Sequence, residues 1–512
     1  MCGLAGFFGK EFNLPDNLKI KRCLSSLKRR GPDSNGIILK SYKNKKLLFL
    51  HTRLSIIDLK RNSNQPIEDE NGLLIFNGMI YNYIELRKKL KLRGVKFKTF
   101  SDTEVLLKIL NLYKEKAFKM LDGMWSIAYY DFQNSNIILS RDRFGEKPLY
   151  FYKKNKDIFF SNSLKSLYHL SGVKLEFDNI KVNQQLKYSD KTIGLNNKTL
   201  FRGIMSVPQG SYLKIDMEKN LIQKKNYWKL RIKKSKMSFS VATKKLQNII
   251  QQVVKTRVRS DVKNSILISG GLDSNTIAFF AKKNSKISGY SLISSNKHYD
   301  ETNLIKISNK KNKLKSKFVK STSSSSLGTL ESIISNSFNV LPTTSALGFA
   351  LLCRQIQRDG RRVILTGVGG DELFAGYYVN FLAHLLSYKG KKFKEKFNFW
   401  NQNIKKFIRN EKLKNLKSNN LFKNRYKLNF FIESDEIKNK YFKNKTNNKI
   451  EILSKDIFFN NMLQNYLIQN VPTQNYANDL VSMHFSLESR SPFLSSILSE
   501  FIYSLRKDYF MY

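Results

Sequence analysis

The chain has 512 residues and a net charge of +51, with 91 lysines and arginines against 40 aspartates and glutamates. This length accommodates roughly two to four domains, and an apolar content of 41% excludes a largely disordered chain. No apolar run is long enough to span a membrane, the start lacks a signal-peptide pattern, and three cysteines without metal spacing exclude a disulfide framework. We therefore expect a cytoplasmic protein with no membrane partner.

The excess of positive charge has two interpretations. A basic surface can bind nucleic acid or another anionic surface. Abundant Lys, Asn, Ile, Phe and Tyr, with lysine far above arginine, are also what AT-rich coding produces without any function. The lysines are scattered, with local density at 389–418 and 436–450, and no RNA-binding or helix-turn-helix motif accompanies them. Compositional drift is the favoured explanation, and we expect no nucleic-acid partner.

Short apolar runs dominate residues 1–230 and predict strands separated by Gly, Asn and Asp turns. They read LLFLH, LLIFN, MWSIAYYD, NIILS, PLYFY and IFF, and YIELRKKLKLRG has the pattern of a helix. The polar, lysine-rich stretch at 229–240 is typical of a linker. The sequence therefore predicts a first domain at residues 1–230 and a second at 231–512.

The second part begins with a predicted helix and continues as a β/α pattern. Apolar residues recur at i, i+3 and i+4 spacing at Leu246, Ile249, Ile250, Val253, Val254 and Val258. Strand-like and helix-like segments then alternate through SILIS, IAFFAKK, ISGYSLIS, a helix near 344–358 and RVILTG. This alternation predicts a parallel sheet. The Ser-rich tract at 321–327 predicts a loop, and residues 379–512 look mostly helical.

The segment SILISGGLDS (265–274) places a glycine-containing loop between a strand and a helix. Backbone N–H groups of such a loop, with the helix N-terminus, form a site for phosphate. Ser269 and Ser274 add hydroxyl groups, and Asp273 suits this place if Mg²⁺ bridges its carboxylate to phosphate oxygens. The chain contains no G-x-x-x-x-G-K-[ST], which excludes a Walker A loop.

The segment RVILTGVGGDELFAGY (362–377) repeats this arrangement further along the chain. Asp371 is the second candidate Mg²⁺ ligand, and Glu372 is a candidate helix cap. Ligands of open parallel sheets bind at the carboxyl ends of strands, so we expect both loops to face one nucleotide.

The start, Met-Cys-Gly, carries a candidate nucleophile. Removal of Met1 leaves Cys2 with a thiol of ordinary pKa about 8.5 and an α-amino group of ordinary pKa about 7.7–8.0. The amino group can take the thiol proton, as the N-terminal-nucleophile arrangement requires. An ordinary cysteine after the start methionine is the alternative, and position alone favours that alternative.

Taken with Cys2, the motifs resemble those of glutamine-dependent asparagine synthetase over nearly the whole chain. SGGLDS is similar to the pyrophosphate loop of N-type ATP pyrophosphatases. The first part carries MCGLAGFFG, RGPDSNG (30–36), HTRLSIIDL (51–59), NQP (64–66), FNGMIYN (76–82), SDTEVLL (101–107), DGMWSIAYYD (122–131) and RDRFGEKPLYFY (141–152). The second carries SGGLDS, YDE (299–301), LTGVGGDELFAGY and SMHFSLESRSPFL (482–494).

The resemblance implies an α/β protein with two parts. Residues 1–230 would form an αββα N-terminal-nucleophile sandwich, a class II glutaminase domain. Residues 231–512 would form a parallel-sheet ATP pyrophosphatase domain with a largely helical C-terminal part. The implied reaction is ATP-dependent amidation of aspartate to asparagine through β-aspartyl-AMP, with ammonia from glutamine arriving through an internal tunnel. ATP and Mg²⁺ are the implied cofactors, and a homodimer is left open.

The resemblance also assigns roles in the glutaminase half. Cys2 would attack the glutamine carboxamide, forming a γ-glutamyl thioester and releasing ammonia. Asn77 and the Gly78 N–H would form the oxyanion hole. Arg53 would clamp the α-carboxylate, and Asp102 would pair with the α-ammonium. The full implied glutamine-binding set is Arg53, Leu54, Ser55, Ile56, Ile57, Asn77, Gly78, Met79 and Asp102.

On the nucleotide side, Leu267 and Leu292 align with the family's adenine contacts, and Thr366 and Gly367 match its Ser-Gly. The implied ATP-binding set is Leu267, Ser269, Gly270, Gly271, Leu272, Asp273, Ser274, Leu292, Thr366 and Gly367, with Asp273 and Asp371 on the metal. Glu488 and Arg490 match a family motif, and a buried structural ion pair explains them equally well.

Three departures from the family bear on function. Met79 replaces a Glu that helps hold the glutamine α-ammonium, which predicts glutamine binding weaker by roughly 1.5–3 kcal/mol. Val368 replaces a Glu near the aspartyl intermediate, which leaves open another acceptor, such as a sugar acid in surface-polysaccharide synthesis. The sequence ends at Tyr512, before a family segment whose Lys and Arg close on the pyrophosphate. A C-terminally truncated, impaired synthetase half beside an active glutaminase is therefore a further alternative.

Overall fold

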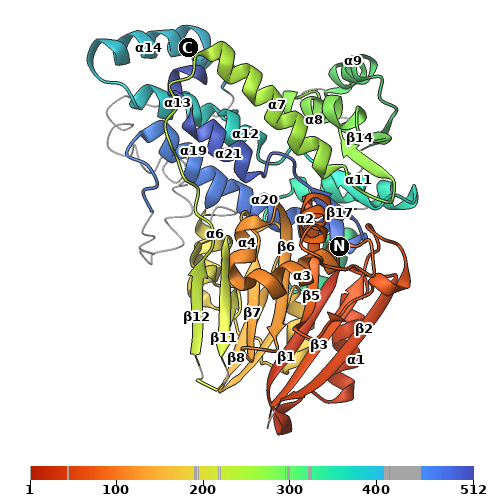
Figure 1. Ribbon diagram of the computed structural model, residues 1–512. Helices are drawn as coiled ribbons and strands as arrows, with labels where there is room; N and C mark the ends of the chain where they lie inside the picture. The colour runs from red at the N-terminus through yellow and green to blue at the C-terminus, as the bar shows by residue number, and fades with distance from the viewer. Residues whose placement is uncertain are drawn as a thin grey trace.

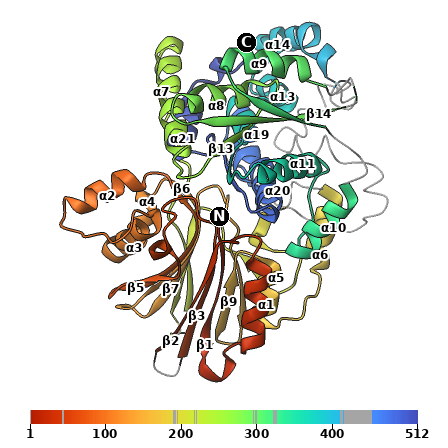
Figure 2. The ribbon, with the colours of Figure 1, turned by 90° about the vertical axis from the view of Figure 1, so that its right-hand side faces the viewer.

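The computed structural model of the protein describes residues 2–42, 45–188, 193, 195–216, 218–219, 221–294, 296, 300–320, 326–408, 414 and 451–511. A β-rich first half and a helix-rich second half stack end to end (Figure 1). The N-terminus lies at the boundary between these halves in two perpendicular views (Figures 1 and 2). The first residues of the chain are therefore placed where both halves can contact them.

The first half contains two six-stranded antiparallel sheets. One sheet has the order β10-β8-β9-β1-β3-β2, from β1 (Gly3–Lys10), β2 (Ser34–Tyr42), β3 (Lys45–Arg53), β8 (Tyr150–Lys154), β9 (Asp157–Ser161) and β10 (Ile204–Ser206). The other has the order β12-β11-β7-β6-β5-β4, from β4 (Ile67–Glu68), β5 (Gly72–Ile80), β6 (Gly123–Asp131), β7 (Asn136–Arg141), β11 (Ser211–Asp216) and β12 (Leu221–Asn226).

Alternating side chains of the strands make the layers. On β1, Leu4 and Phe8 pack into the core between the sheets, whereas Ala5 and Phe7 face the outer helices. Those helices are α1 (Asn17–Leu27) and α5 (Leu164–Ser171), and the second sheet is covered by α2 (Tyr83–Lys91), α3 (Asp102–Tyr113) and α4 (Ala117–Met120). Helix α6 (Asn179–Tyr188) follows α5. The expected αββα sandwich is confirmed.

The second half is built on a five-stranded parallel sheet of order β15-β14-β13-β16-β17. Its strands are β13 (Asn264–Leu267), β14 (Ile287–Ile293), β15 (Ser316–Lys320), β16 (Val363–Leu365) and β17 (Glu488–Arg490). Helix α7 (Phe239–Arg257) precedes the sheet, and the crossover helices are α8 (Leu272–Lys282), α9 (Thr302–Asn312), α10 (Ser326–Ser337) and α11 (Ser345–Arg358). The expected parallel sheet is confirmed.

The rest of the second half is mainly helical, as the sequence predicts. It contains α12 (Gly370–Phe374), α13 (Tyr378–Leu386), α14 (Gly390–Asn403), α19 (Ile457–Leu467), α20 (Asn470–His484) and α21 (Ser496–Ser504). Strand β17 is the exception, because three residues in parallel pairing with β16 leave no periodic signal. Part of the predicted loop at 321–327, residues 321–325, lies outside the described residues, as does the lysine-rich stretch at 436–450.

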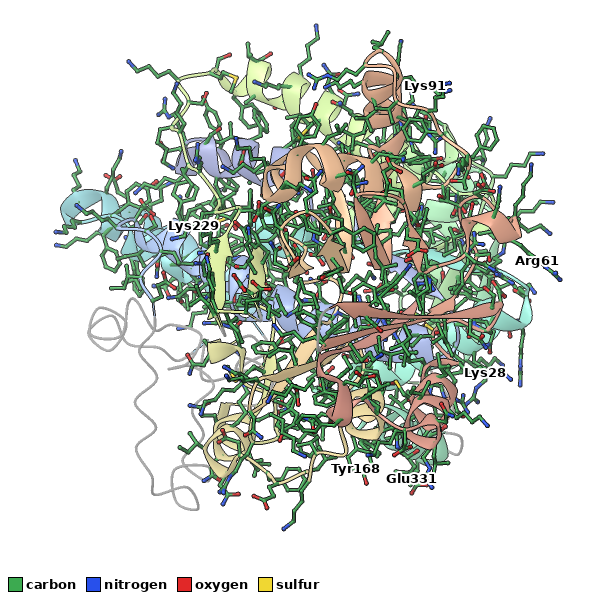
Figure 3. All side chains as sticks on the ribbon, turned by 60° about the horizontal axis from the view of Figure 1, so that its bottom comes forward. Lys28, Arg61, Lys91, Tyr168, Lys229 and Glu331 are labelled. Atoms are coloured by element: carbon green, nitrogen blue, oxygen red, sulfur yellow. The ribbon has the colours of Figure 1, made fainter. Side chains whose placement is uncertain are left out.

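Exposed basic side chains are spread over the molecule. Lys28, Arg61, Lys91 and Lys229 lie on separate sides of it (Figure 3). This distribution agrees with the compositional interpretation of the charge. Among the described residues, no helix combines the length and apolar character needed to cross a membrane.

Charged pairs join the two halves at their boundary. Arg30 pairs with Asp479 at 2.8 Å and Arg257 with Asp122 at 2.6 Å, while Arg259 pairs with Glu85 and Arg362 with Asp33. A small apolar cluster that includes Leu54, Ile56, Met79 and Tyr81 of the first half reaches Val363 of the second. The boundary therefore combines polar contacts with apolar packing close to the start of the chain.

Candidate active sites at the boundary of the two halves

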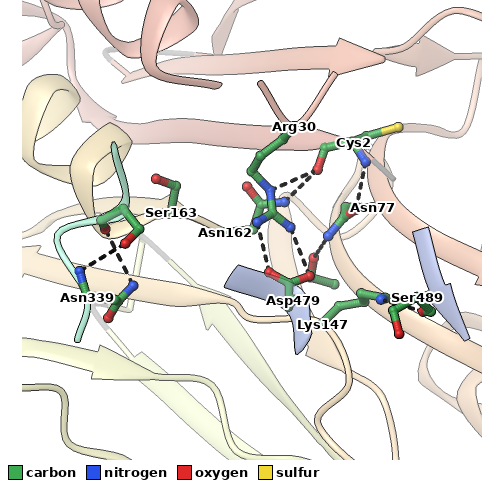
Figure 4. Close-up of polar contacts among 12 residues, drawn as sticks. Cys2, Arg30, Asn77, Lys147, Asn162, Ser163, Asn339, Asp479 and Ser489 are labelled. Atoms are coloured by element: carbon green, nitrogen blue, oxygen red, sulfur yellow. Dashed lines mark hydrogen bonds and ion pairs between the residues drawn. The ribbon is translucent and has the colours of Figure 1, made fainter. Parts of the chain in front are cut away.

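Cys2 is held by its backbone at three points. Its N–H donates to Asn77 Oδ1 at 2.8 Å, and its carbonyl oxygen accepts from Asn162 Nδ2 at 2.9 Å and from Arg30 Nε at 3.3 Å (Figure 4). The sulfur points away from these partners in the same view. The contacts therefore fix the residue and leave the thiol directed elsewhere.

The thiol faces a small cavity that most of the predicted glutamine-binding residues line. The lining includes Cys2, Arg53, Leu54, Ile56, Ile57, Gly78, Met79 and Asp102, together with Ser63, Gln65, Phe76, Ser101, Thr103 and Glu488, which the sequence did not indicate for this site. Two predicted residues lie outside the lining. The Ser55 N–H donates to Asp33 Oδ2 at 2.7 Å, and Asn77 lies behind Cys2, fully buried.

Burial dominates the electrostatics of the Cys2 thiol. It raises the thiol pKa above its ordinary value, while the amino terminus, the Leu54 N–H and Arg53 oppose this effect and Glu488 adds to it. The thiol is therefore protonated at neutral pH and needs a base before it can attack. The α-amino group that removal of Met1 would expose on Cys2 is on the same residue and suits this role.

Arg53 is held by the loop that follows β3. Its Nη1 donates to Lys60 O and Asn64 Oδ1, both at 2.8 Å, and its Nη2 donates to Ile57 O at 3.3 Å and to Asp58 O. These bonds use the hydrogens of both terminal nitrogens. Arg53 also lines the cavity, and the implied two-point clamp requires some of its loop contacts to exchange for a ligand.

Asp102 is the first residue of α3 and lines the cavity. Ser101 caps the helix, so Asp102 is free of the capping role and its Oδ2 accepts the Ile80 N–H at 3.0 Å. Burial raises the Asp102 pKa to about 6, with the Ile80 N–H opposing and Glu488 adding to the rise. The carboxylate is thus ionised at neutral pH and becomes protonated in mild acid.

Glu488 enters the glutaminase cavity from the second half. Its Oε1 accepts from Arg490 Nε at 2.6 Å, and Arg490 Nη1 donates to the Arg257 and Arg259 carbonyls at 2.7 Å each. Although burial opposes ionisation, the Arg490 guanidinium holds the Glu488 pKa below its ordinary value. The interpretation as a buried ion pair is therefore confirmed, and Glu488 in addition lines the cavity of Cys2, a place that the motif did not indicate.

The two candidate oxyanion-hole residues are placed differently. An added Cβ on Gly78 would lie 2.0 Å from Met124 O, so only glycine fits at this point of the cavity wall. Asn77 accepts the Cys2 N–H and donates through Nδ2 to Ser126 Oγ at 3.2 Å. In this conformation Asn77 orients the nucleophile's backbone, while Gly78 lines the cavity.

The loop Ser269–Gly271 joins β13 to α8 at the carboxyl end of the parallel sheet. The Ser269 N–H donates to Ser274 Oγ at 3.2 Å, and the Gly271 N–H donates to Ser269 Oγ at 3.3 Å. The Gly270 N–H donates to a carboxylate oxygen of Glu301 at 2.9 Å. A carboxylate bound there shows that the loop favours an anion, as a phosphate site requires. Tyr299 of the same motif lies outside the described residues.

Asp273 and Asp371 face one another beside this loop. An added Cβ on Gly370 would lie 2.1 Å from Asp273 Oδ2, which shows how closely the two segments approach. Burial and the Asp371 charge raise the Asp273 pKa to about 6, and burial raises that of Asp371. Within the described ranges, no Lys or Arg forms an ion pair with either carboxylate.

This pair of carboxylates fits Mg²⁺, which typically binds one or two carboxylates together with substrate phosphates. A larger all-protein metal site is not indicated, since the part of the chain that the structure describes has no suitable group of three His, Cys, Asp or Glu residues. Two adjacent carboxylates without a cationic partner are the donor set that a phosphate-bound cation requires.

The remaining predicted nucleotide residues gather at the same strand ends. The Thr366 N–H donates to Arg490 O at 2.9 Å, Gly367 lies against Asp273, and Leu267 and Leu292 pack beside α11. Leu272, which begins α8, is exposed. Glu372 does not cap α12, because its buried carboxylate accepts from Tyr377 Oη at 2.6 Å and Gln474 Nε2 at 3.1 Å.

Comparison with protein families matches both halves. A model described as a glutamine amidotransferase domain matches residues 1–228, and one described as asparagine synthase matches residues 245–511. A relative from Methanocaldococcus jannaschii, named "Putative asparagine synthetase (glutamine-hydrolyzing) 2", is 30% identical over 76% of this chain and 77% of its own length.

The chain belongs to the asparagine synthetase family.

The comparisons also find a further relative and a solved structure. Asparagine synthetase (glutamine-hydrolyzing) 1 of Bacillus subtilis is 30% identical over 74% of this chain, which spans 59% of that relative's length. A solved glutamine phosphoribosylpyrophosphate amidotransferase of B. subtilis aligns at 13% identity over 73% of this chain and 77% of its own, with a TM-score of 0.33. As a family member, the protein is a carbon–nitrogen ligase with a glutamine amidotransferase half.

The pKa of Asp102 predicts a pH dependence for glutamine use. The ionised carboxylate would pair with the α-ammonium, so KM for glutamine should rise as the pH falls through about 6. Steady-state glutamine hydrolysis measured from pH 5 to pH 8 checks this. Asp102→Asn should raise KM for glutamine at every pH and abolish the further rise of KM at acidic pH. A KM of the unmodified chain that does not change between pH 5 and pH 8 would contradict the assignment.

Met79 is buried in the cavity wall and adds no charge there. Met79→Glu should lower KM for glutamine by roughly tenfold, because a second carboxylate would reach the α-ammonium. Met79→Gln, of the same shape without charge, is the control and should not lower KM. An equal or higher KM in Met79→Glu would show that the ammonium is held in another way.

Proposed function

We propose that the protein amidates aspartate to asparagine at the expense of ATP, with ammonia released from glutamine at Cys2. In this proposal residues 1–230 are the glutaminase domain and residues 231–512 the synthetase domain. The observation that carries the proposal is the buried, backbone-fixed Cys2 facing a cavity that also holds Arg53 and Asp102. The facing carboxylates of Asp273 and Asp371 support the nucleotide half of the reaction.

In the glutaminase step, the Cys2 α-amino group takes the thiol proton and Sγ attacks the carboxamide carbon of glutamine. The C–N bond then breaks, the amino group returns its proton to the leaving nitrogen, and ammonia departs. Water hydrolyses the γ-glutamyl thioester to glutamate and restores the thiol. Gly78 lines the same cavity and its backbone N–H would stabilise the negative oxygen, while Asp102 and Arg53 would hold the amino-acid end of the substrate.

In the synthetase step, a β-carboxylate oxygen of aspartate attacks the α-phosphorus of ATP and pyrophosphate leaves. Ammonia then attacks the acyl carbon and AMP leaves, which gives the amide. The N–H groups of the loop Ser269–Gly271 would orient the phosphates once these exchange for their present acceptors Ser274, Glu301 and Ser269, and Asp273 and Asp371 would hold Mg²⁺. When bound, Mg²⁺ supplies neutralisation of phosphate charge.

A second acceptor class is favoured by one observation. Val368 lies in the loop after β16, partly buried against the core, so it brings an apolar side chain to the loop that carries Asp371. Another carboxylate, such as a sugar acid, would then be the acceptor. Incubation with ATP and ammonium and a panel of carboxylates, with amide products identified by mass spectrometry, distinguishes the two acceptor classes.

Replacement of the nucleophile separates the two half-reactions. Cys2→Ala should lose glutamine hydrolysis and glutamine-dependent amidation, because no thiol remains to form the thioester. Ammonium-dependent amidation should persist, because the nucleotide residues are unchanged. Both activities are followed by glutamate release and amide formation. Glutamine hydrolysis that survives in Cys2→Ala would disprove the nucleophile assignment.

Loss of one carboxylate tests the metal site. Asp273→Asn should abolish ATP–pyrophosphate exchange in the presence of aspartate and Mg²⁺, while glutamine hydrolysis is retained. The matched control is Asp359→Asn, which precedes β16 and bonds to Tyr290 and Lys317 instead of facing the loop. Exchange at the normal rate in Asp273→Asn would place the metal elsewhere.

A further inference from the structure

We propose that Asp479, on helix α20 of the second half, is a positioning residue for Cys2 and acts on it through Arg30. The proposal rests on the glutaminase function proposed for Cys2. It means that the nucleophile is aligned in part by a residue from the synthetase half. Three hydrogen bonds connect Asp479 to Cys2 through Arg30, and the groups that make them are buried.

All three contacts involve the Arg30 guanidinium. Nη1 donates to Asp479 Oδ2 at 2.8 Å and Nη2 donates to Asp479 Oδ1 at 3.2 Å, so the carboxylate holds the outer edge of the fork. Nε then donates to the Cys2 carbonyl oxygen at 3.3 Å (Figure 4). Because the guanidinium is rigid, fixing its two terminal nitrogens also fixes the direction of its Nε–H.

Burial restricts the exchange of hydrogen-bond partners in this arrangement. Arg30 is 8% exposed and Asp479 is 3% exposed, so neither side chain can exchange its partner freely for water. Removing the carboxylate leaves a buried guanidinium without its counter-charge, which must turn toward other acceptors or toward solvent. The Cys2 carbonyl oxygen would then lose the hydrogen bond that Arg30 donates.

A nucleophile at the start of a chain depends on such contacts more than an internal one. If Met1 is removed, as the proposed glutaminase function requires, the position of Cys2 is set by its own hydrogen bonds and by β1. Asn77 and Asn162, which hold its N–H and its carbonyl oxygen, both come from the first half. Arg30 connects the same carbonyl oxygen to the second half, so the attack geometry of the thiol includes a contribution from α20.

Helix α20 is well placed to hold this position. One turn before Asp479, Asn475 Nδ2 donates to the Phe144 carbonyl of the first half at 2.9 Å. Its neighbour Gln474 donates to Glu372, the residue after the candidate metal ligand Asp371. The helix that carries Asp479 is therefore anchored both to the first half and to the nucleotide side of the second.

The test is steady-state glutamine hydrolysis by the full chain carrying Asp479→Asn. We expect kcat to fall by roughly 10- to 100-fold, as small misplacement of a reacting group does, with KM for glutamine close to that of the unmodified chain. The cavity that binds glutamine does not include Asp479, which is why KM should be spared. Arg30→Lys should give the same split, and the double variant should show no further loss.

The matched control is Asp122→Asn. Asp122 forms another of the two-point pairs across the boundary, with Arg257 at 2.6 and 2.7 Å, and is not a hydrogen-bond partner of Cys2 in the described part of the chain. Asp122→Asn should lower the unfolding temperature as Asp479→Asn does, yet keep kcat within about twofold of the unmodified chain. If Asp479→Asn does not fold, Asp479→Glu carries the same test, because it keeps the charge and displaces the guanidinium.

Two outcomes overturn the proposal while leaving the glutaminase function intact. One is an unchanged kcat in Asp479→Asn or its substitute, and the other is an equal fall of kcat in Asp122→Asn, which would indicate a general effect of the boundary. A different result defeats the proposed function itself: an unmodified chain that hydrolyses no glutamine, or hydrolysis that survives Cys2→Ala. That second result removes the basis of both proposals.

Discussion

A reactive residue at the very start of a chain must be held from outside its own segment. Cys2 meets this requirement by donating a hydrogen bond to Asn77 and accepting one each from Asn162 and Arg30, which come from three separate parts of the chain. The surrounding sheets can place these donors and acceptors because β1 is internal to its sheet, between β9 and β3. The sandwich thus holds the backbone of Cys2 on both its N–H and its carbonyl side.

The buried charges at the boundary between the two halves also relate to the position of Cys2. Glu488 and Arg490 are both buried, and moving such a pair out of water costs more than apolar packing of the same volume would. A functional role for one member of the pair would explain this cost. Glu488 does line the cavity of Cys2. Two residues further on, the Arg490 carbonyl accepts the Thr366 N–H beside the nucleotide loop. Strand β17 therefore contacts both candidate sites within three residues.

Much of this arrangement was predictable from the sequence, for definite physical reasons. Strands of alternating or continuous apolar residues and glycine loops before helices carry local signals, so the sheets and the loop at Ser269 were predicted. Asp479 and Arg30 carry no such signal, since they are separated by 449 positions and either could be an ordinary surface charge. Likewise, the loop carbonyls that hold Arg53 are backbone groups, which no residue type reveals. Glu488 was indicated by its motif, but its place in the glutaminase cavity follows only from the pairing of β17 with β16.

The central claim is that one chain passes nitrogen from glutamine at Cys2 to an ATP-activated carboxylate in its second half. The most direct measurement supplies glutamine labelled with ¹⁵N in its side-chain amide, together with aspartate, ATP, Mg²⁺ and an excess of unlabelled ammonium. Mass spectrometry then reads the label in the amide product. The account predicts asparagine that carries ¹⁵N in its side-chain amide despite the unlabelled pool. Asparagine with only unlabelled amide nitrogen, or ¹⁵N-ammonium released without any amide product, would contradict it.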